Sequence, residues 1–211
     1  DVVIVGAGPA GIFTALEMIK KGSHQKIIMV EKGQPVEKRH CPKDKTRKCM
    51  NCKPYCHITT GFSGAGAFSD GKLSLSYEVG GDLPNLIGPE LAQNIILPQD
   101  PELAQETINY ADQIYLEFGA DTHIEGLEHE EERKEIRKRA IQAGLKLVDC
   151  PIRHMGTEKA QAIYLAIERY LQENGVEMYF GYECSNIILE NDVCKGVAVS
   201  NGKTDLEIYA K

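Results

Sequence analysis

Three glycines near the start of the chain are spaced so that a phosphate group could lie against the backbone. Gly6, Gly8 and Gly11 follow the β-branched run Val2–Val5 and precede apolar residues at helical spacing. The first glycine of such a turn allows a tight bend, the second lets the backbone approach a diphosphate, and the third lets the helix lie close to the sheet. The helix that follows attracts anionic charge at its first turn. The predicted binding turn consists of Gly6, Gly8, Pro9, Ala10 and Gly11.

A carboxylate ends the second predicted strand, Ile27–Val30, at the position that a dinucleotide site requires. Glu31 stands twenty residues after Gly11, where it can accept hydrogen bonds from ribose hydroxyls. The order strand–helix–strand within about thirty residues predicts a right-handed crossover and a parallel sheet. We therefore predict a dinucleotide ligand, and the negative charge argues against NADP because it would repel a 2′-phosphate. The turn and the carboxylate do not distinguish FAD from NAD.

Four cysteines in a basic loop form a second group of residues that could bind a metal ion or take part in redox chemistry. Their spacing is C-x7-C-x2-C-x3-C, and neighbouring lysines favour thiolates over thiols. Four thiolates could bind zinc or anchor an iron–sulfur cluster. A redox-active or disulfide-forming set and a set of unliganded thiols remain alternatives. The predicted metal ligands are Cys41, Cys49, Cys52 and Cys56.

Composition excludes several classes of function. The net charge of −7 argues against a general binder of nucleic acid or of anionic membranes. No apolar run reaches the roughly 18 residues of a transmembrane helix. Seven cysteines, an odd number, fit a reducing compartment, and we expect the cytoplasm. We expect a small-molecule substrate as partner, and a piece of a longer protein, because the chain starts at Asp1 and stops within a strand-like pattern.

The remaining periodicity predicts the elements that would position these groups. Three helices are expected at Pro101–Gly119, at the highly charged and exposed Glu128–Ala140, and at Thr157–Asn174. Three segments alternate like antiparallel strands: Val176–Phe180, Ser185–Leu189 and Val193–Ser200. The predicted fold class is α/β, with a Rossmann-like domain formed by residues 1–75 and 154–211, a small antiparallel β element, and an inserted substrate or cap region at 76–153.

The N-terminal part resembles the flavoprotein superfamily that contains glutathione reductase and p-hydroxybenzoate hydroxylase. The resemblance lies in the GAGPAG turn at Gly6–Gly11, in Glu31-Lys32-Gly33 and in Arg39. It implies that the site binds the ADP half of FAD. GAGAFSDGKL at Gly64–Leu73, with Cys41-Pro42 and Ile152–Thr157, is similar to a family of uncharacterised FAD-dependent dehydrogenases, loosely described as NAD-utilising. That similarity implies a cofactor and a type of reaction, and no particular substrate.

The resemblance also assigns roles to single residues. It implies that Glu31 and Lys32 belong to the cofactor site, that Arg39 binds phosphate, and that backbone groups around Cys184 bind the adenine. Small residues without bulk would let backbone N–H groups reach the flavin diphosphate and ring. This predicted flavin loop is Gly64-Ala65-Gly66-Ala67.

Two residues are weak candidates for catalysis. Lys72 could stabilise an anionic reduced flavin or be a surface lysine. His154 could bind substrate, shuttle a proton or be structural. The predicted function is an FAD-dependent oxidoreductase that passes a hydride or electrons between a substrate, or NAD(P)H, and the flavin. The first alternative is a flavin- or NAD-binding protein without turnover that uses the Cys41–Cys56 loop as a redox or metal sensor. A second alternative, suggested by the basic stretch Lys43–Lys53, is a flavoenzyme that acts on nucleic acid.

Overall fold

A computed structural model describes residues 1–76, 79 and 101–210. The chain forms two compact units, one built from Asp1–Ser69 with Thr157–Lys211 and the other from Asp70–Gly156. Of the predicted inserted region, residues 77–78 and 80–100 lie outside the described residues. The first unit holds the elements that carry the predicted nucleotide site, and each unit is described by itself below.

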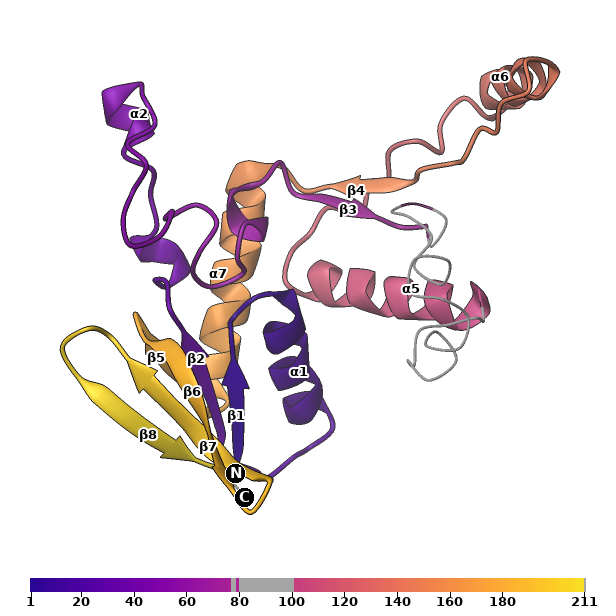
Figure 1. Cartoon of the computed structure of the whole chain (residues 1–211). Helices are drawn as coiled ribbons and strands as arrows, with labels where there is room; N and C mark the ends of the chain where they lie inside the picture. The colour runs from indigo at the N-terminus through magenta and orange to yellow at the C-terminus, as the bar shows by residue number, and fades with distance from the viewer. Residues whose placement is uncertain (77–78, 80–100, 211) are drawn as a thin grey trace. The chain divides into compact units, whose positions relative to one another are not determined.

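The first unit contains the predicted parallel sheet. Strands β1 (Val2–Val5), β2 (Ile27–Glu31) and β5 (Glu177–Phe180) lie in the order β1-β2-β5, and all neighbours are parallel. Helix α1 (Pro9–Lys20) connects β1 to β2 and buries Ile12, Ala15 and Leu16. The strand–helix–strand prediction is therefore confirmed (Figure 1).

The expected direction of the segment 176–180 was wrong. This segment forms β5, which runs parallel to β2 with Met178 opposite Met29. Helix α7 (Thr157–Glu173) precedes β5 and returns the chain to the start of the sheet, so the strand enters in the same direction as β2. Alternation of apolar and polar residues reports that one face is exposed, and it does not report strand direction.

A small antiparallel sheet completes the first unit, as predicted. It consists of β6 (Glu183–Glu190), β7 (Val193–Ser200) and β8 (Asp205–Tyr209) in the order β6-β7-β8. The turn residues Asn191 and Asp192 have φ angles of 50° and 62°, as a tight hairpin with the twist of its strands requires. The buried side chains of Val197, Val199 and Ile208 form one cluster with Val30 of β2.

The long loop between β2 and β3 (Lys72–Ser74) contains two short 3₁₀ segments that hold it in place. Segment η1 (Val36–Lys38) and segment η2 (Gly66–Phe68) both contact α7. The one-turn helix α2 (Lys43–Thr46) lies between them in the cysteine loop and has no buried residue. Helix α7 presents an apolar face to the core, formed by Ala160, Ile163, Tyr164, Ile167 and Leu171.

The second unit is built around a two-stranded antiparallel ribbon and a buried ion pair. Strand β3 (Lys72–Ser74) pairs with β4 (Ile152–His154), and helix α5 spans Pro101–Glu117. Arg153 of β4 donates to both carboxylate oxygens of Asp112 on α5, at 2.5 and 2.6 Å, and both residues are buried. Removing one partner of such a pair leaves a buried charge without compensation, so this contact fixes β4 against α5.

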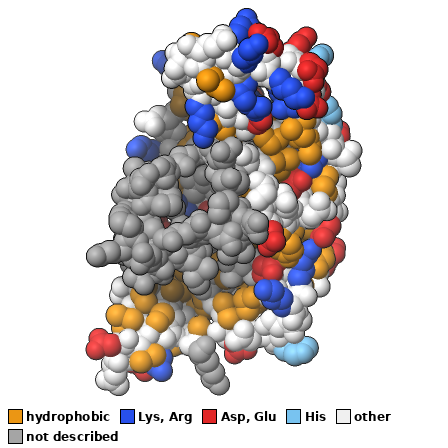
Figure 2. All heavy atoms as spheres, turned by 90° about the vertical axis from the view of Figure 1, so that its right-hand side faces the viewer, with side chains coloured by type: hydrophobic (Ala, Val, Ile, Leu, Met, Phe, Trp, Pro, Cys, Tyr) orange, Lys and Arg blue, Asp and Glu red, His pale blue; other side chains and the backbone are white. Residues whose placement is uncertain are grey.

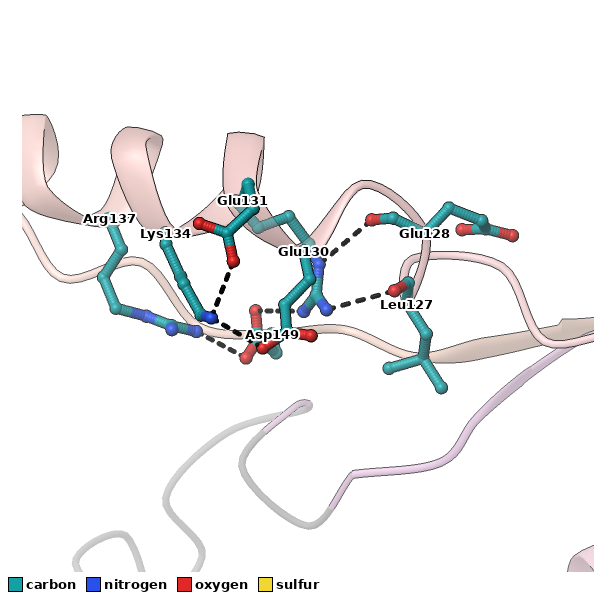
Figure 3. A network of polar contacts seen from close by, with 8 residues as sticks. Leu127, Glu128, Glu130, Glu131, Lys134, Arg137 and Asp149 are labelled. Atoms are coloured by element: carbon teal, nitrogen blue, oxygen red, sulfur yellow. Dashed lines mark hydrogen bonds and ion pairs between the residues drawn. The ribbon is translucent and has the colours of Figure 1, made fainter.

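Helix α6 (Glu130–Gln142) is the exposed charged helix that the sequence predicts, and it has no buried side chain. Asp149 accepts hydrogen bonds from Arg133 and Arg137, which lie one turn apart on the helix (Figure 3). Figure 2 shows basic and acidic side chains interspersed at the top of the view. Within the described ranges, no helix is long and apolar enough to cross a membrane.

Candidate functional site

Each of the three glycines in the N-terminal turn has a different structural role. Gly6 has a φ of +98°, which residues with a side chain rarely adopt. A Cβ on Gly11 would lie 2.1 Å from the Gly6 carbonyl oxygen and 3.0 Å from Cγ2 of Ile4, so only glycine lets α1 lie this close to β1. A Cβ on Gly8 would have no protein atom within 4 Å. The space beside Gly8 is therefore open to a ligand.

The first turn of α1 is left without an anionic partner from the protein. Its N-cap is Gly8, no side chain caps the helix, and no acidic residue lies in its first turn. Pro9 has no N–H, and the N–H of Ile12 already donates to the Gly8 carbonyl at 3.0 Å. The N–H groups of Ala10 and Gly11 stand at positions that have no intrahelical acceptor. An external phosphate fits this end of the helix.

Glu31 lies against the same turn. Its carboxylate is buried, with Oε2 accepting the Ala7 N–H at 2.9 Å and Oε1 accepting the Gly33 N–H at 2.8 Å. An ionised carboxylate can accept about four hydrogen bonds, so two positions remain for ribose hydroxyls. The two existing bonds fix the orientation of the carboxylate before any ligand arrives.

A pocket of about 280 Å³ opens beside Glu31 at the carboxyl ends of β1 and β2. Ligands of open parallel sheets bind at this edge. Val5 at the edge of the pocket is 53% exposed, which is unusual for a valine at the end of a buried strand. The structure brings four predicted cofactor residues together here, because the pocket is lined by Val5, Gly6, Val30, Glu31, Lys32, Tyr182, Glu183 and Cys184.

Arg39, the predicted phosphate ligand, is buried and holds the loop that follows it. Its guanidinium donates four hydrogen bonds to the backbone carbonyls of His57, Ile58, Phe62 and Gly64. Its Cζ also lies 4.6 Å from the centre of the Phe68 ring. Four of its five N–H groups are thus engaged. Phosphate binding by Arg39 stays a prediction, and its contacts show a role in shaping the loop.

The predicted flavin loop lies next to the glycine turn. The N–H of Ser63 donates to the Ala7 carbonyl at 2.7 Å, and the Ser63 hydroxyl accepts the N–H of Ala67 at 3.0 Å. A Cβ on Gly66 would lie 2.9 Å from the Tyr164 hydroxyl of α7. The absence of a side chain at Gly66 therefore allows close contact with α7. Their contact with a flavin stays a prediction.

The four predicted metal ligands remain free thiols. Cys41 and Cys52 are half-buried, whereas Cys49 and Cys56 are exposed. In the part of the chain that the structure describes, no three His, Cys, Asp or Glu side chains are arranged to hold a metal ion, so the metal prediction gains no support. Hydrogen bonds from the backbone N–H groups of Ile58 and Thr59 lower the pKa of the Cys56 thiol, and the Thr59 hydroxyl contributes further.

The two candidate catalytic residues lie opposite each other in the second unit. Lys72 of β3 is paired in register with His154 of β4. Lys72 Nζ lies 2.8 Å from Asp70 Oδ2, and His154 Nδ1 lies 3.3 Å from Glu125 Oε1. The Asp70 carboxylate raises the pKa of Lys72 through this contact. Both side chains are partly exposed, so a solvent-borne molecule can reach them.

Glu168 is a buried carboxyl that the sequence interpretation missed. Its Oε2 accepts the N–H of Val36 at 3.0 Å and connects α7 to the segment η1. Burial raises the pKa of Glu168, while the hydrogen bond from Val36 opposes this. The signal was its place beside Ile167 in the buried stripe of α7, where a charged residue is out of pattern.

Replacing Glu168 by glutamine is expected to stabilise the protein at pH 8 and to leave its stability at pH 4 unchanged. Because the folded-state pKa is raised, the contribution of Glu168 is fully present below the ordinary carboxyl pKa of about 4.3 and is lost as pH rises through the raised value. Glutamine keeps an acceptor for the Val36 N–H without the charge. Urea unfolding at both pH values measures the effect.

The exposed Glu173 at the end of the same helix provides the control for this substitution. Glu173→Gln is expected to change the free energy of unfolding by less than about 0.5 kcal/mol at either pH. A Glu168→Gln variant that loses stability equally at pH 4 and pH 8 would contradict the explanation.

Comparison with known proteins agrees with this geometry. Residues 1–40 match the family described as FAD binding domain. A protein of Clostridium beijerinckii named only as uncharacterised is 44% identical over 72 residues, which are 34% of this chain and 13% of the relative. This chain therefore covers 13% of the length of that curated relative.

Solved structures with little sequence identity share the fold. The 3-ketosteroid-Δ4-(5α)-dehydrogenase of Rhodococcus jostii matches with a TM-score of 0.55 and 13% identity, over 100% of this chain and 44% of that one. Sdh1 of Mycobacterium smegmatis matches with a TM-score of 0.50 and 13% identity, over 100% of this chain and 32% of that one. The chain shares its α/β fold with these two structures, and its first 40 residues carry the match to the FAD binding domain.

Proposed function

We propose that the chain is the FAD-binding part of an FAD-dependent oxidoreductase that acts on a small molecule. One observation carries the proposal: Glu31 and the glycine turn share one pocket at the carboxyl edge of the parallel sheet. The open space beside Gly8 and the uncapped first turn of α1 fit a diphosphate next to that pocket. The first unit would hold FAD, and the second unit would belong to the region that receives the substrate.

The residues of the chain would bind and orient the cofactor. The N–H groups of Ala10 and Gly11 would hold the diphosphate, and the free acceptor positions of Glu31 would hold the ribose hydroxyls. Lys32 and the backbone at Cys184 line the far side of the same pocket. FAD, when bound, supplies the capacity to accept and donate a hydride or an electron pair.

The Lys72–His154 ribbon is the proposed source of proton transfer to or from the substrate. His154 has Glu125 as a hydrogen-bonding partner on one ring nitrogen, which fixes the ring and selects its tautomer. The neighbouring Lys72–Asp70 pair supplies a charged group on the same ribbon. Substrate carboxylates or carbonyls are the groups that such side chains bind.

Several finer assignments belong to the same proposal. We propose membership of the uncharacterised FAD-dependent dehydrogenase family within the glutathione-reductase-like superfamily, with NAD(P)H as a co-substrate. The cytoplasm is the proposed location because the cysteines are free. Zinc or an iron–sulfur cluster on the cysteine loop is a further prediction. Elemental analysis of protein purified without oxygen tests it, and a zinc and iron content near zero would reject it.

A visible spectrum of the full-length protein tests the proposed function. Purified protein is expected to be yellow, to show flavin absorption bands, and to bleach on addition of dithionite. Colourless full-length protein that does not bind added FAD would reject the proposal. Reduced flavin that no acceptor reoxidises, together with metal-dependent binding to a partner, would instead favour the alternative of a redox or metal sensor that uses the Cys41–Cys56 loop.

Replacing Glu31 by glutamine is expected to weaken FAD binding at least tenfold, because hydrogen bonds to a charged acceptor contribute about 1.5–3 kcal/mol. The amide group also places an NH₂ opposite the N–H of Ala7 or of Gly33. Fluorescence titration with FAD measures the dissociation constant. Glu190→Gln at the exposed end of β6 is the matched control, and an equal loss of affinity in both variants would contradict the role of Glu31.

A further inference from the structure

A second pocket adjoins the one beside Glu31. It has a volume of about 490 Å³ and lies within the first unit. The two pockets share three lining residues, Lys32, Glu183 and Cys184, so they are neighbours. Only the pocket beside Glu31 also reaches Gly6. The second pocket therefore adjoins Lys32 and does not touch the glycine turn.

One wall of the second pocket comes from the cysteine loop. Pro54 and Tyr55 line it, and the Tyr55 side chain is half-buried. The centre of the Tyr55 ring lies 6.3 Å from that of His57, with the two rings tilted by 58°. This neighbour on one side restricts the orientations open to the Tyr55 ring. The loop thus contributes a flat aromatic surface to a pocket that Lys32, the neighbour of Glu31 in the chain, also lines.

Other residues of the second pocket carry hydrogen-bonding groups. These residues are Ser185, Ser200 and Asn201. The pairing of β6 with β7 shifts between Cys184 and Asn186, which leaves Ser185 outside the regular register. A bulged residue keeps its backbone groups out of the ladder, so they remain available to a ligand. An aromatic ring and polar groups that line one pocket are the combination that a heteroaromatic base requires.

The order of these groups follows the order of a dinucleotide. The diphosphate position is at Gly8 and the first turn of α1, and the ribose position is at Glu31. The next group of the ligand is the base, and the next space in the protein is the pocket bounded by Tyr55. We propose that Tyr55 stacks on the adenine and makes the cysteine loop a determinant of cofactor affinity. This inference rests on the proposed function.

Titration of full-length protein with FAD and with ADP tests the role of Tyr55. Tyr55→Ala is expected to weaken binding of both ligands about tenfold, because base–aromatic stacking has an effect of this size in alanine variants. Tyr55→Phe keeps the ring and is expected to bind within twofold of the wild type. Tyr209→Ala on β8 removes a tyrosine that is 57% exposed and lines neither pocket, and it is expected to have no effect.

The outcomes separate this inference from the proposed function. Wild-type protein that binds neither FAD nor ADP would overturn both. Wild-type binding together with unchanged dissociation constants in Tyr55→Ala would overturn the inference alone. Should Tyr55→Ala fail to fold, nitration of the wild type followed by mass spectrometry decides: ADP is expected to protect Tyr55 and to leave Tyr209 unprotected, and equal nitration of Tyr55 with and without ADP would overturn the inference.

Discussion

Gly11→Ala is expected to destabilise the first unit by about 3 kcal/mol or more, a large part of the stability of a typical domain. The added Cβ would lie 2.1 Å from the Gly6 carbonyl oxygen and 3.0 Å from Ile4 Cγ2. Neither atom can move away cheaply, because one is backbone and the other is part of a buried strand. Helix α1 would have to shift, and with it the fully buried Ile12 and Leu16. Urea unfolding and soluble yield measure the loss.

Gly8→Ala is the matched control for this substitution. Gly8 has an ordinary φ of −78°, and no protein atom lies within 4 Å of the position of its Cβ. The fold is therefore expected to keep its stability to within about 1 kcal/mol. FAD binding is expected to weaken at least tenfold, because the methyl group occupies the approach of the diphosphate. Equal unfolding free energies for the two variants would contradict these separate roles.

The glycine turn and Glu31 could be predicted from sequence because their signals are local. A strand, a turn and a helix follow one another without interruption, and each glycine has a fixed task within that unit. The carboxylate follows at the end of the next strand, which the crossover places beside the first. The structure agrees in detail: the Ala7 N–H donates directly to the Glu31 carboxylate.

The rest of the site depends on contacts between segments that are distant in the chain. Glu168 accepts a hydrogen bond from Val36, which is 132 residues away in the sequence, and Lys72 is paired with His154 in the β3–β4 ribbon. The pocket at Tyr55 needs the cysteine loop, the start of β6 and the β7–β8 turn at once. Periodicity describes which face of an element is buried, and it does not specify the partner of that face. The direction of β5 was predicted wrongly for the same reason, because periodicity does not specify which strand β5 pairs with.

Arg39 shows how one sequence position supports two physical interpretations. A basic residue shortly after Glu31 is placed to bind phosphate, and resemblance assigns it that role. A buried guanidinium can equally serve as a template for a loop, because its planar fork donates in five fixed directions. The structure engages four of these donors with carbonyls of residues 57–64. Substitution of Arg39 separates the two interpretations.

Arg39→Ala is expected to destabilise the protein by about 3–5 kcal/mol, because several shielded carbonyls lose their donors together. Arg39→Lys is expected to recover little of this, since an ammonium group cannot reach the same set of acceptors. The exposed neighbour Lys38 provides the control, and Lys38→Ala is expected to cost less than about 0.5 kcal/mol. Urea unfolding measures the free energies, and limited proteolysis reports whether the 57–64 loop is exposed. If Arg39→Ala instead keeps its stability and loses only its affinity for FAD, the guanidinium is a phosphate ligand and the structural interpretation is wrong.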